Sequence, residues 1–196
     1  MIEIIQPTQF KTVPWKNGKG NTVEMAINPG GTLDNFDWRL SMASVVEDGI
    51  FSNFTGYTRN LILIAGDSIN LQHNDSKIDR LSQLLDVATF DGGDKTVGNL
   101  PAGEITDFNV IVRTSAYNTQ LDSQRKANVF SLQQSDLCFI YSLFNSAELT
   151  LNNANNSNQI TELAAGHLVK ITGLQANSAT LTGDHLIIVY LHAVKS

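Results

Sequence analysis

The residues of this chain that could do chemistry are polar side chains set into apolar, strand-like sequence within the first 113 positions. Three of them are arginines, and two of these, Arg39 and Arg59, each present a planar fork of N–H donors that matches a carboxylate. The others are indole, amide, hydroxyl, acidic and basic side chains: Trp15, Asn17, Glu24, Trp38, Ser41, Asp107, Asn109 and Arg113. If these side chains converge, they form a pocket for a small anion. If they diverge, they are ordinary solvent-facing residues, and the pattern of residues leaves both alternatives open.

A converging cluster would give each side chain a role in binding a small carboxylate. Arg39 and Arg59 would bind the carboxylate group, because a buried arginine needs an anionic partner. The ligand would be oriented by the neutral side chains of Asn17, Ser41 and Asn109. The walls of the pocket would be formed by Trp15 and Trp38. Two acidic residues would hold the arginines in place, namely Glu24 and Asp107.

The sequence lacks the patterns of the commonest catalytic sites. Its four histidines form no His-x-His or His-Glu-x-x-His pattern, so neither a metal ion nor another cofactor is expected. There is no Gly-x-Ser-x-Gly elbow, and the glycines at 18 and 20 lack the spacing of a phosphate-binding loop. Cys138 is the only cysteine and lies in an apolar run, so it is interpreted as an inert core thiol rather than a nucleophile.

Strands with a period of two residues would position the polar cluster. In 36–45, Phe36, Trp38, Leu40 and Met42 fall on one face, whereas Asp37, Arg39, Ser41 and Ala43 fall on the other. The segment 107–114 alternates in the same way, with Asp107, Asn109, Ile111 and Arg113 on one face. Alternation in 22–27 places Val23, Met25 and Ile27 together, opposite Thr22, Glu24 and Ala26.

The remaining segments predict an all-β protein. Many short apolar runs separated by glycine-rich turns are typical of a sandwich, jelly roll or barrel. The similar strand density of the two halves suggests two barrels, residues 1–116 and 117–196. One stretch, 75–87, has apolar residues near a helical spacing and is interpreted as a short helix or a single helical turn. The polar stretch 117–126 is interpreted as the connection between the halves.

Composition narrows the range of partners and compartments. The net charge of −6 without any basic run makes nucleic acid and an anionic membrane poor partners. The N-terminus lacks the basic start and apolar stretch of a signal peptide, and no segment approaches the roughly 18 apolar residues of a membrane span. The chain is therefore expected to be a soluble cytoplasmic protein.

Four motifs in the first half resemble the HutD/Ves family of bacterial proteins. They are Trp-x-Asn-Gly-x-Gly-x-Thr-x-Glu at 15–24, Trp-Arg-x-Ser-x-Ala at 38–43, Asp-Gly-x-Phe-Ser-x-Phe-x-Gly-x-x-Arg at 48–59, and Asp-Phe-Asn-x-x-x-Arg at 107–113. Lys19 stands where the family usually has glycine, and Val23 stands where it often has arginine. Ile50 and Thr55 replace prolines that are common in the family.

The resemblance implies a bicupin fold, with two jelly-roll (double-stranded β-helix) barrels that share a core and can exchange strands, and without the usual metal-ligating histidines. It also implies a non-catalytic binding protein for a small carboxylate that regulates histidine utilisation, with urocanate or a formylated glutamate as ligand. A homodimer is one possible assembly. The alternative is a metal-independent cupin enzyme, an isomerase or hydrolase with Glu24 or Asp107 as general base. A third hypothesis is an interaction module with a tryptophan-lined groove and no converging polar groups.

Overall fold

The computed structural model describes residues 1–15, 21–152 and 158–195, and these form two compact units made almost entirely of β-strands. One unit is Phe10–Tyr117, and the other combines Met1–Gln9 with Asn118–Ser196. The only helical element among the described residues is the short 3₁₀ segment η1 (Pro7–Gln9). No helix within the ranges that the structure describes has the length and hydropathy to cross a membrane. The boundary drawn at residue 116 from the sequence stays a prediction.

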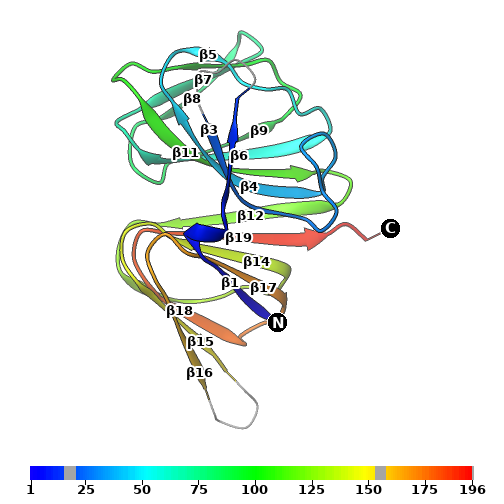
Figure 1. Ribbon diagram of the computed structural model, residues 1–196, viewed down its shortest axis with the longest axis vertical. Helices are drawn as coiled ribbons and strands as arrows, with labels where there is room; N and C mark the ends of the chain where they lie inside the picture. The colour runs from blue at the N-terminus through cyan, green and yellow to red at the C-terminus, as the bar shows by residue number, and fades with distance from the viewer. Residues whose placement is uncertain (16–20, 153–157, 196) are drawn as a thin grey trace. The chain divides into compact units, whose positions relative to one another are not determined.

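The Phe10–Tyr117 unit consists of two antiparallel sheets with an apolar core between them (Figure 1). The order of strands in the six-stranded sheet is β2 (Lys11–Pro14), β3 (Asn21–Ile27), β4 (Trp38–Val45), β11 (Ile105–Arg113), β6 (Tyr57–Ala65) and β9 (Val87–Asp91). The order in the four-stranded sheet is β5 (Gly49–Ile50), β10 (Thr96–Asn99), β7 (Ile69–His73) and β8 (Lys77–Leu81). Leu61 and Leu63 of the first sheet pack with Ile69 and Leu71 of the second.

The register of the six-stranded sheet places the predicted polar residues on its inner face. Ser41 of β4 lies opposite Asn109 of β11, and Asn109 lies opposite Leu61 of β6. Directly opposed residues in an antiparallel pair project to the same side. Because Leu61 belongs to the apolar core, Ser41 and Asn109 also point toward the interior. The alternation predicted for β4 and β11 is therefore confirmed, and a single inner face carries both apolar and polar residues.

A β-bulge in β3 makes the prediction for 22–27 partly wrong. Glu24 lies opposite Ser41 and Ala26 lies opposite Leu40, so Met25 is an extra residue that has no partner of its own in β4. The extra residue reverses the faces downstream of it. Ile27 consequently lies opposite Arg39 and shares the inner face with Glu24, instead of the opposite face expected from strict alternation.

Two further segments differ from their prediction. The stretch 75–87, expected to be helical, contains strand β8, which pairs with β7 from Ile69↔Leu81 to His73↔Lys77. Its helical spacing arises because the apolar residues of a strand and of the following turn are counted together. The stretch 117–126, expected to be a connection, contains β12 (Tyr117–Gln124) at the edge of a sheet. Its polar composition agrees with the burial of its side chains, which are half-buried or exposed and in no case fully buried.

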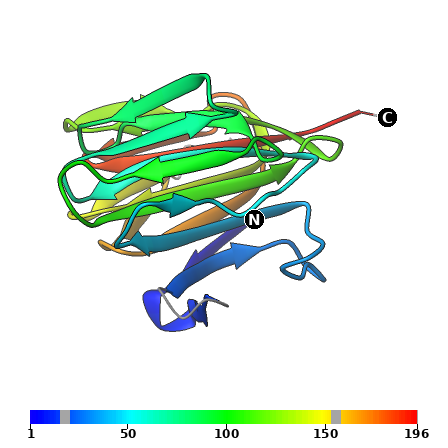
Figure 2. The same cartoon turned by 90° about the horizontal axis from the view of Figure 1, so that it is seen from above.

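The second unit repeats the two-sheet arrangement. Its five-stranded sheet has the order β1 (Ile2–Ile5), β17 (Leu168–Leu174), β14 (Ser135–Ser142), β19 (Leu186–Ala193) and β12, and its four-stranded sheet has the order β13 (Asn128–Ser131), β18 (Ala179–Gly183), β15 (Ala147–Leu151) and β16 (Gln159–Leu163). In both views β1, in dark blue, runs beside the orange β17 (Figures 1 and 2). The first residues of the chain thus complete the sheet formed by its last 80 residues or so.

The thiol of Cys138 is fully buried in the core of the second unit, among residues such as Ile140 and Leu149. Burial raises the pKa of Cys138 well above its usual value. Because only the thiolate reacts, we expect a thiol-reactive disulfide reagent to modify less than a tenth of the native protein in the time that modifies all of it in denaturant. Rapid stoichiometric labelling of the native protein would contradict the burial.

Candidate functional site

The Phe10–Tyr117 unit contains a pocket of about 800 Å³ at the polar part of its inner face. Known sites for small molecules have volumes of roughly 300–1,000 Å³. Strands β4, β6 and β11 supply the polar wall, and the segment 46–55 supplies the opposite wall. The predicted residues among those that line the pocket are Trp15, Arg39, Ser41, Arg59, Asp107 and Asn109. The polar side chains therefore converge, and the alternative in which they are solvent-facing does not describe this part of the chain.

The register of the sheet explains why the two arginines meet at one pocket. Ile111 of β11 lies opposite Arg39 on one side and opposite Arg59 on the other. The arginines therefore occupy one row of the inner face, on strands that flank β11. The next row along the strands holds Ser41 and Asn109, and the row after that holds Asp107.

Arg39 is nearly buried but keeps hydrogen-bonding capacity toward the pocket. Its Nε donates to Oε2 of Glu24 at 2.7 Å, and the two side chains are 7% and 12% exposed. Glu24 is within reach because it lies opposite Ser41, one row away from Arg39. Neither terminal nitrogen of Arg39 has a hydrogen-bond partner among the described residues. Arg39 is thus oriented by Glu24 through one edge of the guanidinium, and the Nη atoms are available to a ligand.

Arg59 is held by more contacts than Arg39. Its Nη1 donates to the carbonyl of Ser52 at 3.2 Å, and its Nη2 donates to Oδ1 of Asn109 at 2.9 Å. The rings of Phe51, Phe54 and Phe90 lie 5.2–5.5 Å from its guanidinium carbon, within the range of cation–π contacts. Burial lowers the pKa of Arg59 to about 10, which leaves the group cationic at neutral pH.

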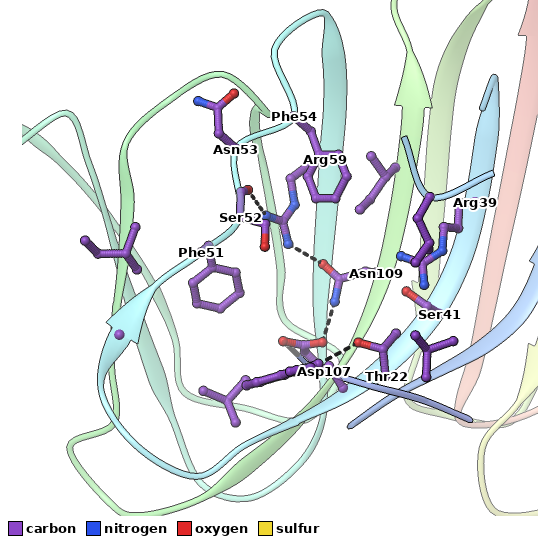
Figure 3. A pocket seen from close by; sticks show the side chains of 18 of the residues that line it. Thr22, Arg39, Ser41, Phe51, Ser52, Asn53, Phe54, Arg59, Asp107 and Asn109 are labelled. Atoms are coloured by element: carbon purple, nitrogen blue, oxygen red, sulfur yellow. Dashed lines mark hydrogen bonds between the residues drawn. The ribbon is translucent and has the colours of Figure 1, made fainter. Parts of the chain in front are cut away.

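Asn109 connects Arg59 to Asp107 (Figure 3). Its Oδ1 accepts from Arg59, and its Nδ2 donates to Oδ1 of Asp107. Asp107 is fully buried, and its Oδ2 has no hydrogen-bond partner among the described residues. Burial raises the pKa of Asp107 to about 7, while the nearby charge of Arg59 acts in the opposite direction. The pocket therefore contains an acid that changes its charge near neutral pH.

The other predicted residues have different positions. Trp15 lines the pocket, and its indole N–H donates to Oγ1 of Thr22 at 2.8 Å. Trp38 is buried but is not among the described residues that line the pocket, because it alternates with Arg39 along β4 and projects from the other face. Arg113 is likewise outside the lining set and pairs with Asp37 at 3.1 Å. Asn17 lies outside the described residues.

The sequence-based interpretation missed the aromatic residues around Arg59. Phe51 and Phe54 contact its guanidinium from the segment before β6, and Phe90 contacts it from β9. The sequence contained a signal for Phe51 and Phe54, because both residues belong to the motif at 48–59 that ends in Arg59. Nothing in the sequence near Phe90 pointed to this contact, because the two residues meet only through the pairing of β6 with β9.

Histidine, cysteine and acidic side chains do not gather into a metal-binding group in the described part of the chain, where no cluster of three or more was found. The polar groups that line the pocket are instead guanidinium, amide, hydroxyl and carboxyl groups. Such a set is suited to hydrogen bonding with a small polar ligand.

Two β-sandwich units, each formed by two antiparallel sheets, define the class of protein as a bicupin. The model of the HutD family matches residues 7–189, and the chain belongs to this family. The family is linked to the histidine-utilisation locus. The resemblance to HutD/Ves and the all-β bicupin fold expected from it are thereby confirmed.

Two curated relatives match about half of the chain or somewhat more. An uncharacterised protein encoded in the hutC 3′ region of Pseudomonas putida is 35% identical over 120 residues, which cover 61% of this chain and 63% of the relative. Protein Ves of Escherichia fergusonii is 37% identical over 103 residues, which cover 52% of this chain and 53% of that protein. The chain thus spans less than two thirds of the length of either relative.

Two solved structures match nearly the whole chain. HutD from Pseudomonas fluorescens SBW25 has a TM-score of 0.83 and is 24% identical, with all of both chains covered. A conserved protein of unknown function from Pseudomonas aeruginosa PAO1 has a TM-score of 0.84 and is 25% identical, with 98% of this chain and 99% of that chain covered. The match to HutD supports the fold across both units.

Proposed function

We propose that this chain is a non-catalytic binding protein for a small carboxylate metabolite and that it regulates histidine utilisation. The observation that carries the proposal is the geometry of Arg39 at the pocket, whose guanidinium is anchored by Glu24 and whose two terminal nitrogens have no hydrogen-bond partner among the residues that the structure describes. A carboxylate forms two parallel hydrogen bonds with such an edge of a guanidinium. The link to histidine utilisation rests on the family to which the chain belongs.

The pocket lining fits a ligand that is polar at one end. Ser41 lies one row from Arg39 and supplies a hydroxyl group that can donate to the second oxygen of a carboxylate or accept from a neighbouring group. Trp15 and Phe51 supply apolar surface for the rest of the ligand. Arg59 contributes positive charge, but Ser52 and Asn109 already accept from both of its terminal nitrogens. Arg39 is therefore the principal carboxylate contact, with Arg59 as the support of the pocket wall.

Calorimetric titration tests this proposal directly. We expect saturable heat on addition of urocanate or formylglutamate to the whole protein at high concentration. The amides of the same compounds lack the carboxylate charge, and as matched controls they are expected to give little or no heat. If neither acid gives heat, the proposed ligand class is wrong.

A second candidate, a metal-independent enzyme, is favoured by one observation. Asp107 is buried with a pKa near 7, which is the range that suits a general acid or base at neutral pH. Glu24 is less suited to this role, because its carboxylate is occupied by Arg39. Consumption of urocanate or formylglutamate that is followed by chromatography, and that is lost in Asp107→Asn while heat of binding persists, would favour the enzyme over the binding protein.

A further inference from the structure

We propose that ligand binding at this pocket is coupled to protonation of Asp107, which takes up one proton from solvent and directs its Oδ2–H group at an oxygen of the bound ligand. This inference rests on the proposed function, since it concerns a carboxylate bound in the same pocket. It adds a specificity-determining residue to the site: the ligand must offer a hydrogen-bond acceptor to Asp107 as well as a carboxylate to Arg39.

The geometry of Asp107 leaves one position for a proton. Oδ1 accepts from Nδ2 of Asn109, and the orientation of that amide is fixed because its Oδ1 accepts from Arg59. Oδ2 has no partner among the described residues, although Asp107 is fully buried and borders the pocket. The backbone of Ala43 and the side chain of Asn109 support the ionised carboxylate by hydrogen bonds, but among the described residues no hydrogen bond stabilises a charge on Oδ2 itself. A proton on Oδ2 converts the unpartnered acceptor into a donor.

The balance of charge around the pocket favours this protonation when an anion binds. The ionisable groups that line or support the pocket come from every element around it: Glu24 of β3, Asp34 of the β3–β4 connection, Arg39 of β4, Glu47 and Asp48 before β5, and Tyr57 and Arg59 of β6. The positive charge of Arg39 is offset by its ion pair with Glu24. Arg59 is therefore the cation with the largest electrostatic effect on Asp107. A bound carboxylate adds negative charge beside Asp107 in a poorly solvated site, and two neighbouring carboxylates do not both remain ionised.

On the opposite sheet, three ionisable groups, His73, Lys77 and Asp79, interact with each other instead of facing the pocket, and Arg80 is exposed. Nε2 of His73 lies 3.2 Å from Oδ2 of Asp79, and Lys77 lies 3.0 Å from the same oxygen. None of these three is among the described residues that line the pocket. These residues are therefore not an alternative to Asp107 as the group that takes up the proton when the ligand binds.

The direction of the pH dependence follows. Burial gives Asp107 a pKa of about 7 in the free protein, and a bound anion raises it further. Below the free pKa, Asp107 is already protonated and affinity is insensitive to pH. At a pH between the pKa of Asp107 in the free protein and its pKa in the complex, binding of each ligand is accompanied by the uptake of one proton from solvent. The dissociation constant therefore rises about tenfold for each unit of pH in this range. Affinity is therefore lost as the pH rises above about 7.

Carbon-13 NMR of protein labelled at the aspartate carboxyl groups tests the coupling. The signal of Asp107 is identified by its absence from Asp107→Asn, and its titration is followed with formylglutamate, with acetate, and with sodium chloride at equal ionic strength. We expect the pKa of Asp107 to rise with formylglutamate or acetate but not with chloride. Calorimetry in two buffers of different ionisation enthalpy is expected to show uptake of up to one proton per ligand near pH 8.

Variants separate this inference from the proposed function. The affinity of Asp107→Asn for formylglutamate is expected to be independent of pH, whereas Asp67→Asn, at an exposed residue outside the pocket lining, is expected to keep the pH dependence of the wild type. Heat of binding without any change in the titration of Asp107 would overturn the coupling and leave carboxylate binding intact. The absence of both heat and change in titration would overturn the two together.

Discussion

Replacement of Arg59 by alanine is expected to lower the free energy of unfolding by about 3–5 kcal/mol, since one member of a buried polar network is removed and its partners stay behind. The carbonyl of Ser52 and Oδ1 of Asn109 both lose a donor. Phe51, Phe54 and Phe90 lose the guanidinium on which they pack. Urea unfolding monitored by circular dichroism measures the loss.

The loss in Arg59→Ala should also depend on pH. Arg59 lowers the pKa of Asp107, so its removal raises that pKa further. A carboxyl group whose folded pKa exceeds its unfolded pKa contributes less stability as the pH rises through the folded value. The destabilisation is thus expected to be greater at pH 8.5 than at pH 6.

Two control variants define the interpretation of Arg59→Ala. Arg80 is exposed on β8, and Arg80→Ala is expected to change stability by no more than about 0.5 kcal/mol. Arg59→Met keeps apolar contact with the rings and removes only the charge and the donors. If Arg59→Ala is as stable as Arg80→Ala, the hydrogen bonds of Arg59 with Ser52 and Asn109 do not stabilise the fold.

Replacement of Arg39 by lysine is expected to weaken carboxylate binding by about 30-fold or more, as typically found when one partner of a buried charge pair is truncated. Lysine retains the positive charge but lacks the planar fork that would contact Glu24 and a ligand at the same time. Calorimetric titration with formylglutamate compares the dissociation constants at a pH below 7, where the state of Asp107 does not contribute.

Arg113→Lys is the matched control for Arg39→Lys. Arg113 lies on the same sheet and is also paired with an acidic residue, but its guanidinium contacts Asp37 and the ring of Tyr57 instead of the pocket. Its replacement is expected to leave the dissociation constant within about threefold of the wild type, in keeping with small effects away from a site. Equal losses in the two variants would mean that Arg39 acts through the fold and not through contact with the ligand.

Residues on single strands were predictable from the sequence because the period of a strand fixes its faces. Alternation grouped Arg39 with Ser41 and Asp107 with Asn109, and the register of β4 and β11 brings the two groups together. The same alternation placed Trp38 on the face opposite Arg39, so the sequence already argued against its role as a pocket wall. That role came from residue type alone, which carries no direction.

Features that depend on pairing between strands were not predictable. The bulge at Met25 exists because β3 has one residue more than β4 over the same length, and a single strand contains no record of its partner. The contact of Phe90 with Arg59 likewise arises from the pairing of β6 with β9. The raised pKa of Asp107 depends on complete burial, which follows from the packing of two sheets and not from the local sequence.

The extra residue at Met25 divides strand β3 into two parts that serve different neighbours. Before it, Thr22 and Glu24 lie on the inner face, where Thr22 lines the pocket and Glu24 orients Arg39. After it, Ile27 packs against the apolar cluster of Phe36, Tyr57 and Ile111. If the full strand paired regularly from Glu24 onward, Met25 would lie opposite Leu40 and Ala26 would take the place of Ile27 opposite Arg39. The bulge thus lets one strand keep Glu24 beside Arg39 and Ile27 in the apolar cluster at the same time.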